Sequence, residues 1–143
     1  DIPIMIDRRA LKVNSINTGV PHAVIFVEGL EKIDIVNLGR LIRYHKQFLP
    51  AGTNVDFVEI LKDRFLKVRT YERGVEDETL ACGTGSVASA LIYALKAKLD
   101  GQIAVQTRSK EVLFVYCDKN TRVFKNVWLQ GGAHFVAKGM FLM

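Results

Sequence analysis

Residues 86–97 are the segment that most constrains the fold of this chain. They contain no Gly or Pro and few β-branched residues, so the stretch 86–98 is expected to be a helix. Its apolar side chains leave little polar face; they are Val87, Ala88, Ala90, Leu91, Ile92, Ala94, Leu95 and Ala97. A helix that is apolar nearly all round is normally buried. The sequence therefore predicts an α+β fold in which strands wrap around a central buried helix.

The rest of the chain is rich in strand patterns. Strands are expected at 11–17, 22–28, 54–61, 64–72, 103–107, 111–117, 122–129 and 134–142. Another helix is expected to begin after Asp34 as its N-cap. The buried stripe of that helix would be Ile35, Leu38, Leu41 and Ile42. Because no long linker and no internal repeat is present, residues 1–143 are expected to form a single domain.

Composition excludes several classes of protein. Hydrophobic residues make up 49% of the chain, which indicates a globular protein and not a disordered one. No apolar run reaches the roughly 20 residues of a membrane span, and the first residues do not resemble a signal peptide. The net charge of +5 is spread among acidic residues, so neither a nucleic-acid partner nor a membrane is expected. Two cysteines in unlike contexts do not make a disulfide framework, which favours a cytoplasmic location.

Cys82 is the first candidate functional residue. It lies in the sequence Leu-Ala-Cys-Gly-Thr-Gly at 80–85, directly before the buried helix. Free backbone N–H groups and the positive end of a helix dipole favour a thiolate at that place. The same N–H groups could hold a substrate carboxylate, and a thiolate beside a carboxylate suits chemistry at an α-carbon. The alternative is a buried structural cysteine at a tight turn.

Four further positions carry polar groups at strand ends: His22, Asn54, Glu72 and Arg73. Each also has a structural interpretation, as a half-buried histidine, as turn chemistry or as surface charge. The histidines and cysteines do not have the spacing of a metal site, and the glycines at 83–85 do not make a phosphate-binding loop. A cysteine hydrolase that pairs Cys82 with His22 stays open.

Three segments together resemble the second half of diaminopimelate epimerase. They are Thr-Gly-Val-Pro-His at 18–22, Thr-Asn-Val-Asp-Phe at 53–57, and the run from Tyr-Glu-Arg-Gly at 71–74 to Glu-Thr-Leu-Ala-Cys-Gly-Thr-Gly at 78–85. Cys-Gly-Thr-Gly alone is weak, because proline racemases and related isomerases share something similar. The combination with Glu-Arg-Gly is specific, and the resemblance covers essentially the whole chain.

The resemblance implies a fold of two similar α+β domains, each with strands about a central helix, and an active site between them. It also implies a chemistry without a cofactor or metal. One cysteine thiolate takes the α-proton and a second thiol delivers a proton to the opposite face of the carbon. Inversion needs a base and an acid on opposite sides of one carbon, and a thiol of tuned pKa can act as either. The family is commonly homodimeric.

The resemblance also implies roles for single residues. The implied catalytic positions are Cys82, His22 and Glu72. The implied substrate-binding positions are Asn54, Arg73, Gly83 and Thr84. Gly83 and Thr84 would hold the reacting α-carboxylate, whereas Arg73 and Asn54 would bind the distal end of the small amino-acid substrate.

Two departures from the family pattern matter. Many members have Asn where Val20 stands, so recognition of the distal end is expected to be rearranged. The first domain, with the partner cysteine in its own Gly-rich motif, is not in this chain. Cys117 is no substitute, because it lies in a strand-like run without a glycine loop or a helix start.

The first interpretation is therefore the C-terminal half of an epimerase that interconverts LL- and meso-diaminopimelate in lysine biosynthesis. This isomerase would be inactive without its N-terminal half. Two alternatives are an isomerase of the same fold for another amino acid, such as proline, and a non-catalytic domain. Arg73 with Asn54 argues against the proline-type substrate, which has no distal charged end.

Overall fold

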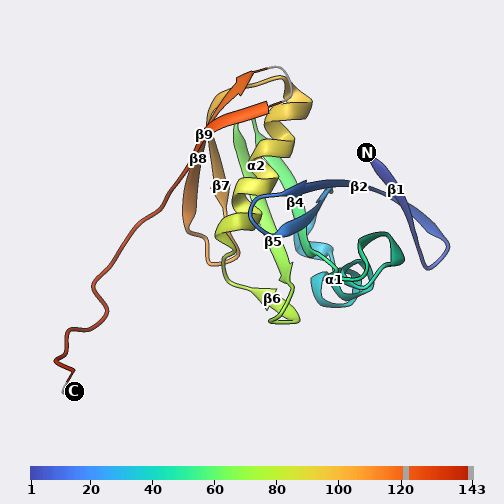
Figure 1. The fold of residues 1–143 in the computed structure, drawn as a ribbon, viewed down its shortest axis with the longest axis horizontal. Coiled ribbons are helices and arrows are strands. Elements are labelled where there is room, and N and C mark those ends of the chain that lie inside the picture. Colours follow the sequence, from blue (N-terminus) through green and yellow to red (C-terminus); the bar gives the residue numbers. More distant parts are fainter. Residues whose placement is uncertain (121–122, 142–143) are drawn as a thin grey trace.

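A computed structural model describes residues 1–120 and 123–141, without the side chains of 119–120. The elements in chain order are β1 (Ile2–Ile6), β2 (Arg9–Asn17), β3 (Pro21–Phe26), α1 (Ile35–Arg43), β4 (Asn54–Lys62), β5 (Phe65–Glu72), β6 (Asp77–Thr79), α2 (Gly83–Ala97), β7 (Gly101–Gln106), β8 (Val112–Asn120) and β9 (Val123–Gln130). Short 3₁₀ turns at Leu30–Lys32 and Lys46–Phe48 flank α1. Figure 1 shows α2 lying along the strands, with α1 near the lower end of the sheet.

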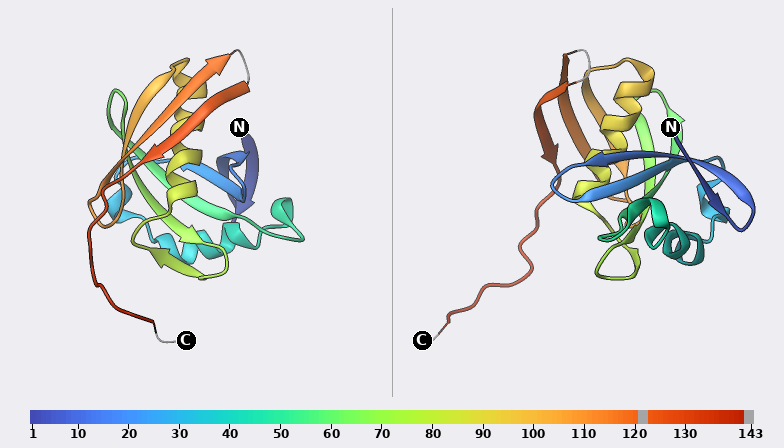
Figure 2. Two further views of the ribbon diagram at one scale, coloured as in Figure 1. Left: turned by 60° about the vertical axis from the view of Figure 1, so that its left-hand side comes forward. Right: turned by 45° about the vertical axis from the view of Figure 1, so that its right-hand side comes forward.

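The strands form one mixed sheet within the described residues. Its order is β1-β2-β3-β4-β5-β7-β8-β9, and β6 pairs with β5. Strand β3 runs parallel to β4, because the connection between them crosses over through α1. Strands β4 and β5 form an antiparallel hairpin, in which Lys62 pairs with Phe65 across the turn. The sheet curls around α2, as the two further views in Figure 2 show.

The helix α2 is central, as its apolar circumference predicts. It contacts β2, β3, β4, β5, β7, β8 and β9. Its residues from Ala88 to Ala94 are all buried, and Leu91 is only 5% exposed. The last turn departs from the expectation, because Leu95 is 41% exposed. The α+β fold with strands around a buried helix is thus confirmed.

Two apolar cores lie on opposite faces of the sheet. On β3, Val24 packs into the core around α2, whereas its neighbours Ala23 and Ile25 pack into the core around α1. This alternation follows from the two-residue period of a strand. It matters for function, because even-numbered residues of β3, β4 and the middle of β5 face α2.

The first helix begins where Asp34 predicts. Asp34 is its N-cap, and the side chain accepts a hydrogen bond from the backbone N–H of Asn37 at 3.1 Å. Ile35 and Ile42 are buried, but Leu41 is exposed, so that member of the expected stripe is wrong. Gly39 lies against β5, because a Cβ there would be 2.5 Å from the Cβ of Tyr71.

The end of the chain is the clearest failure of the sequence prediction. No strand is present in the described part of 134–142; residues 131–141 have no regular structure, and residue 142 lies outside the described residues. Figure 1 shows this segment leaving the body of the molecule. The side chains of Phe135 and Phe141 are fully exposed. The expected strand 122–129 is present as β9, with residue 122 itself outside the described part.

No helix in the described part of the chain is long and apolar enough to cross a membrane.

Candidate active site at the start of the central helix

Cys82 is the N-cap of α2. Its Sγ accepts a hydrogen bond from the backbone N–H of Gly85 at 3.3 Å and lies 3.5 Å from the hydroxyl of Thr84. Its backbone carbonyl accepts bonds from the N–H and the hydroxyl of Ser86, both at 2.9 Å. The side chain of Cys82 is therefore held at the helix start in one orientation, and the residue is 8% exposed.

The ionisation of this thiol differs from the expectation that a helix start favours the thiolate. Burial, the largest effect, raises the pKa of Cys82 above its ordinary value. The hydrogen bonds from Thr84 and Gly85 lower the pKa, but the negative charges of Asp56 and Glu72 raise it further. The net direction of the pKa shift is upward, which favours the protonated thiol over the thiolate.

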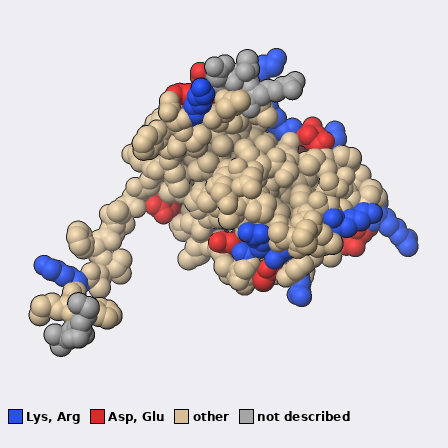
Figure 3. All heavy atoms as spheres, in the orientation of Figure 1, with Lys and Arg blue, Asp and Glu red and all other residues tan. Residues whose placement is uncertain are grey.

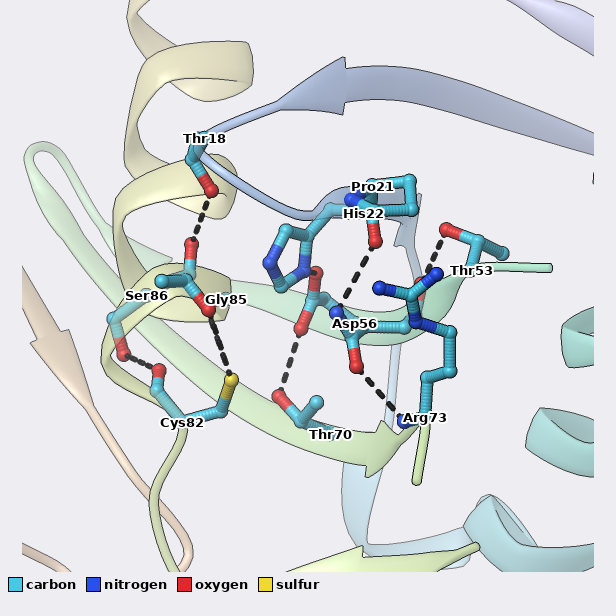
Figure 4. Close-up of polar contacts among 12 residues, drawn as sticks. Thr18, Pro21, His22, Thr53, Asp56, Thr70, Arg73, Cys82, Gly85 and Ser86 are labelled. Atoms are coloured by element: carbon cyan, nitrogen blue, oxygen red, sulfur yellow. Dashed lines mark hydrogen bonds and ion pairs between the residues drawn. The ribbon is translucent and has the colours of Figure 1, made fainter. Parts of the chain in front are cut away.

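His22 lies deep beside this helix start. It is fully buried at the beginning of β3, and its Nδ1 lies 2.7 Å from Oδ2 of Asp56 on β4. The other carboxylate oxygen of Asp56 accepts a hydrogen bond from the hydroxyl of Thr70 on β5 at 2.8 Å. Figure 4 shows these side chains between the strands and the first turn of α2. The two-residue period of the strands places all three on the face that α2 covers.

Asp56 is the site residue to which sequence reasoning gave no role. It is fully buried between Val55 and Phe57, which face the opposite core. A carboxylate in the middle of an apolar strand is a usable signal, since buried charges are normally paired. The sequence alone does not name its partner, because His22 is 34 residues away.

Asn54 and Arg73 lie together where β4 begins and β5 has just ended. The side-chain Oδ1 of Asn54 accepts a hydrogen bond from the backbone N–H of Arg73 at 2.8 Å. Its Nδ2 donates to the carbonyl of Pro21 at 3.1 Å. Asn54 thus ties two strand ends together, and its side-chain amide has a second N–H besides the one given to Pro21. The guanidinium of Arg73 donates from Nη1 to the carbonyl of Ala51 at 3.3 Å and retains further donors.

The first turn of α2 contacts the loop that precedes His22. The hydroxyl of Thr18 donates to the carbonyl of Thr84 at 3.2 Å. The first N–H groups of a helix have no partner within the helix. The backbone N–H of Gly85 bonds to the Cys82 sulfur. The N–H groups of Gly83 and Thr84 come just before it, at the start of α2. Val20 is partly exposed in the same loop, between β2 and β3.

The segment that leads to Cys82 is anchored by ion pairs. The guanidinium of Arg69 on β5 binds both carboxylate oxygens of Glu78 on β6, at 2.6 and 2.8 Å. Arg108 lies 3.2 Å from the same carboxylate. A bidentate pair of this kind fixes geometry as well as charge. The route from Glu72 to Cys82 is therefore held against the sheet.

The space beside Cys82 is very small in this chain. A cavity of about 10 Å³ lies between Cys82, Ser86, Thr70 and the segment from Thr79 to Ala81. That volume has room for about one water molecule. An amino acid is too large to be enclosed in that volume.

Cys117 lies elsewhere. It is 1% exposed on β8 and belongs to the core around α2. In residues 1–120 and 123–141, no group of three or more His, Cys, Asp or Glu side chains could hold a metal ion.

Comparison with known proteins identifies the family to which the chain is similar. The family model described as diaminopimelate epimerase matches residues 14–136. A diaminopimelate epimerase of Aquifex aeolicus is 49% identical over 125 residues, which are 87% of this chain and 44% of that protein. A diaminopimelate epimerase of a Hydrogenobaculum species is 43% identical over 98% of this chain and 50% of that protein. The chain thus spans about half the length of the curated relatives that it matches.

A solved structure is similar at a lower level. It is described as a Bacillus anthracis phenazine biosynthesis protein of the PhzF family, with a TM-score of 0.49 and 16% identity over 78% of this chain and 36% of that one. The family-model match covers most of the chain, and it includes Cys82 with its helix start and the buried His22. This chain therefore belongs to the diaminopimelate epimerase family.

Proposed function

We propose that this chain is the C-terminal half of a diaminopimelate epimerase and supplies one of two thiols that invert the α-carbon. The observation that carries the proposal is the setting of Cys82, a nearly buried thiol held by Gly85 and Thr84 at the start of a central helix. In one direction of the epimerisation, the thiolate of the second cysteine removes the α-proton of the substrate as the C–H bond breaks. Cys82 then donates its proton to the opposite face, and the two cysteines exchange protonation states.

The raised pKa of Cys82 supports the donor role. A thiol that delivers a proton must carry it at working pH, and burial with two nearby carboxylates keeps it there. After transfer, the thiolate can accept hydrogen bonds from Gly85 and Thr84. The reverse reaction begins from that state, so no cofactor is required to move the proton.

Substrate contacts follow from the positions around this thiol. We propose that the N–H groups of Gly83 and Thr84 bind the reacting α-carboxylate at the positive end of α2. We propose that Arg73 pairs with the distal carboxylate, with the second side-chain N–H of Asn54 beside it. Val20 offers no polar side chain, so the guanidinium of Arg73 carries more of this recognition.

The second thiol would come from an N-terminal half that covers this site. The cavity at Cys82 is too small for a substrate, which supports a site completed from outside. Large apolar side chains also stand exposed at Leu80, Trp128, Phe135 and Phe141. Figure 3 shows that charged side chains lie mainly around the rim of one face, whose middle carries few. Of these, Leu80 lies two residues before Cys82 and Trp128 lies on β9, so exposed apolar side chains on the body of the molecule support our proposal that a further domain covers it. The homodimer implied by family resemblance stays a prediction.

The test compares the two cysteines in one protein that joins this chain to the first half of the Aquifex aeolicus relative. Cys82→Ala should abolish conversion of LL- to meso-diaminopimelate, while Cys117→Ala should leave it largely intact. Circular dichroism and an unfolding curve check that both variants are folded. Equal losses from two folded variants would contradict the assignment of Cys82. An inactive joined protein with intact fold would favour a non-catalytic domain.

A further inference from the structure

The proposed reaction does not explain the buried pair of His22 and Asp56. Both side chains are fully buried, and the carboxylate uses both of its oxygens, one for His22 and one for the hydroxyl of Thr70. Placing a carboxylate under a helix is costly unless it is fully hydrogen-bonded. The cost here is met by two side chains from the flanking strands, which hold the carboxylate in a fixed position.

This carboxylate lies close to the reacting thiol. A Cβ added at Gly85 would be 2.3 Å from Oδ1 of Asp56 and 3.2 Å from Sγ of Cys82. One glycine of the helix therefore separates the two groups, and only glycine fits there without displacing one of them. The charged or titratable groups near the thiol include His22 from β3, Asp56 from β4 and Glu72 from β5, and Arg108 lines the same small cavity as Cys82.

The second nitrogen of His22 is unused. Its Nε2 is buried and has no hydrogen-bond partner among the described residues. A neutral imidazole carries one N–H and one acceptor nitrogen, and the bond made by the first decides which is which. Because an ionised carboxylate can only accept a hydrogen bond, a neutral ring bonded to it through Nδ1 must carry its proton there, and Nε2 is then the acceptor. Figure 4 draws the ring between Asp56 and the first turn of α2.

We propose that Asp56 is a positioning residue, which holds His22 in the tautomer protonated at Nδ1 and leaves Nε2 as an acceptor beside the first turn of α2. A buried carboxylate in this arrangement orients the ring and stabilises any imidazolium that forms when Nε2 receives a proton. It also keeps a negative charge next to Cys82, which opposes loss of the thiol proton. The role in proton transfer rests on the proposed function, whereas the tautomer does not.

The direct measurement is the tautomer of His22 by long-range ¹H–¹⁵N NMR of the ¹⁵N-histidine-labelled chain at neutral pH. The other two histidines are assigned and removed from the spectrum with His45→Gln and His134→Gln. We expect a protonated Nδ1 and an unprotonated Nε2 for His22. A His22 protonated at Nε2, or at both nitrogens, would overturn the proposal without any variant of Asp56.

Two variants separate the effect of Asp56 on the tautomer of His22 from the effect of a nearby negative charge on Cys82. In Asp56→Asn, His22 should lose its fixed tautomer, and the pH midpoint of Cys82 alkylation should shift downward. Alkylation is measured by mass spectrometry of the labelled peptide. Glu72→Gln should shift the alkylation midpoint in the same direction but leave the tautomer unchanged. Asp34→Asn, an equal change at the cap of α1, should leave both readouts as they are.

Different results of these experiments would reject the positioning role of Asp56 and the proposed epimerase function. An unchanged tautomer and alkylation midpoint in folded Asp56→Asn would reject the positioning role. The expected NMR and alkylation results together with an inactive joined protein would reject the epimerase proposal and leave the role of Asp56 standing.

Discussion

Leu91→Ala tests the buried helix on which the fold is built. Leu91 is 5% exposed and packs in the core formed by α2 and the surrounding strands. Removing its side chain costs the transfer free energy of the lost methyl groups and leaves a cavity that the curled sheet cannot collapse to fill. We expect the free energy of unfolding to fall by about 2–5 kcal/mol.

Leu95→Ala is the matched control. It is the same change one turn later on the same helix, but Leu95 is 41% exposed. Its truncation removes less buried surface and leaves no closed cavity, so the expected loss is about 1 kcal/mol or less. Both substitutions place alanine in a helix, so the difference between them does not come from helix propensity.

The assay is equilibrium unfolding in urea, followed by far-ultraviolet circular dichroism with tryptophan fluorescence as a second probe. The unfolding curves from the two probes should coincide, and the slope of the free energy against urea should be equal for the unsubstituted chain, Leu91→Ala and Leu95→Ala. These two results would show that a two-state comparison is valid. Equal losses of unfolding free energy in Leu91→Ala and Leu95→Ala would contradict the buried position of Leu91, because they would mean that the middle of α2 is no better packed than its last turn.

Two further predictions concern the other helix and the distal subsite. Gly39→Ala should lower the free energy of unfolding by about 1–3 kcal/mol, because the new Cβ would lie 2.5 Å from the Cβ of Tyr71. Val36→Ala, on the exposed face of α1, should change the free energy of unfolding little. A Gly39→Ala variant more stable than the unsubstituted chain would contradict the close packing. In the joined protein, Arg73→Ala should raise KM for diaminopimelate roughly tenfold or more, as expected for loss of a charged hydrogen bond, with a smaller effect on kcat. Arg64→Lys, at the far end of the same hairpin, should leave KM unchanged, and an unchanged KM in Arg73→Ala would rule out the distal role.

Local pattern was enough to predict the elements that bury one continuous face. The apolar circumference of 86–97 predicted α2 and the strands around it, and Asp34 predicted the start of α1 within one residue. The same reasoning missed the short strand β6, which has only three residues and exists because it pairs with β5. It also placed a strand at 134–142, although the described residues 134–141 pair with no strand and do not extend the sheet beyond its edge strand β9.

Sequence pattern named candidate site residues one by one, but it did not predict how they contact one another. Cys82, His22, Glu72 and Arg73 stand out through motif and position, yet the ionisation of Cys82 depends on burial and on neighbours from other strands. The pairing of His22 with Asp56 depends on the parallel register of β3 and β4, in which His22 lies opposite Asn54 and Val24 opposite Asp56. Register between strands joined by a long crossover is a tertiary property, so sequence pattern does not specify it.

This chain is proposed to provide one thiol of a pair and therefore half of the acid/base machinery. The most direct test incubates LL-diaminopimelate in heavy water under reducing conditions with this chain alone and with the joined protein, and follows stereochemistry and deuterium at the α-carbon. We expect the joined protein to form the meso isomer with α-deuterium and the chain alone to form none. Conversion to the meso isomer by the 143-residue chain, with no second polypeptide detectable by mass, would contradict it.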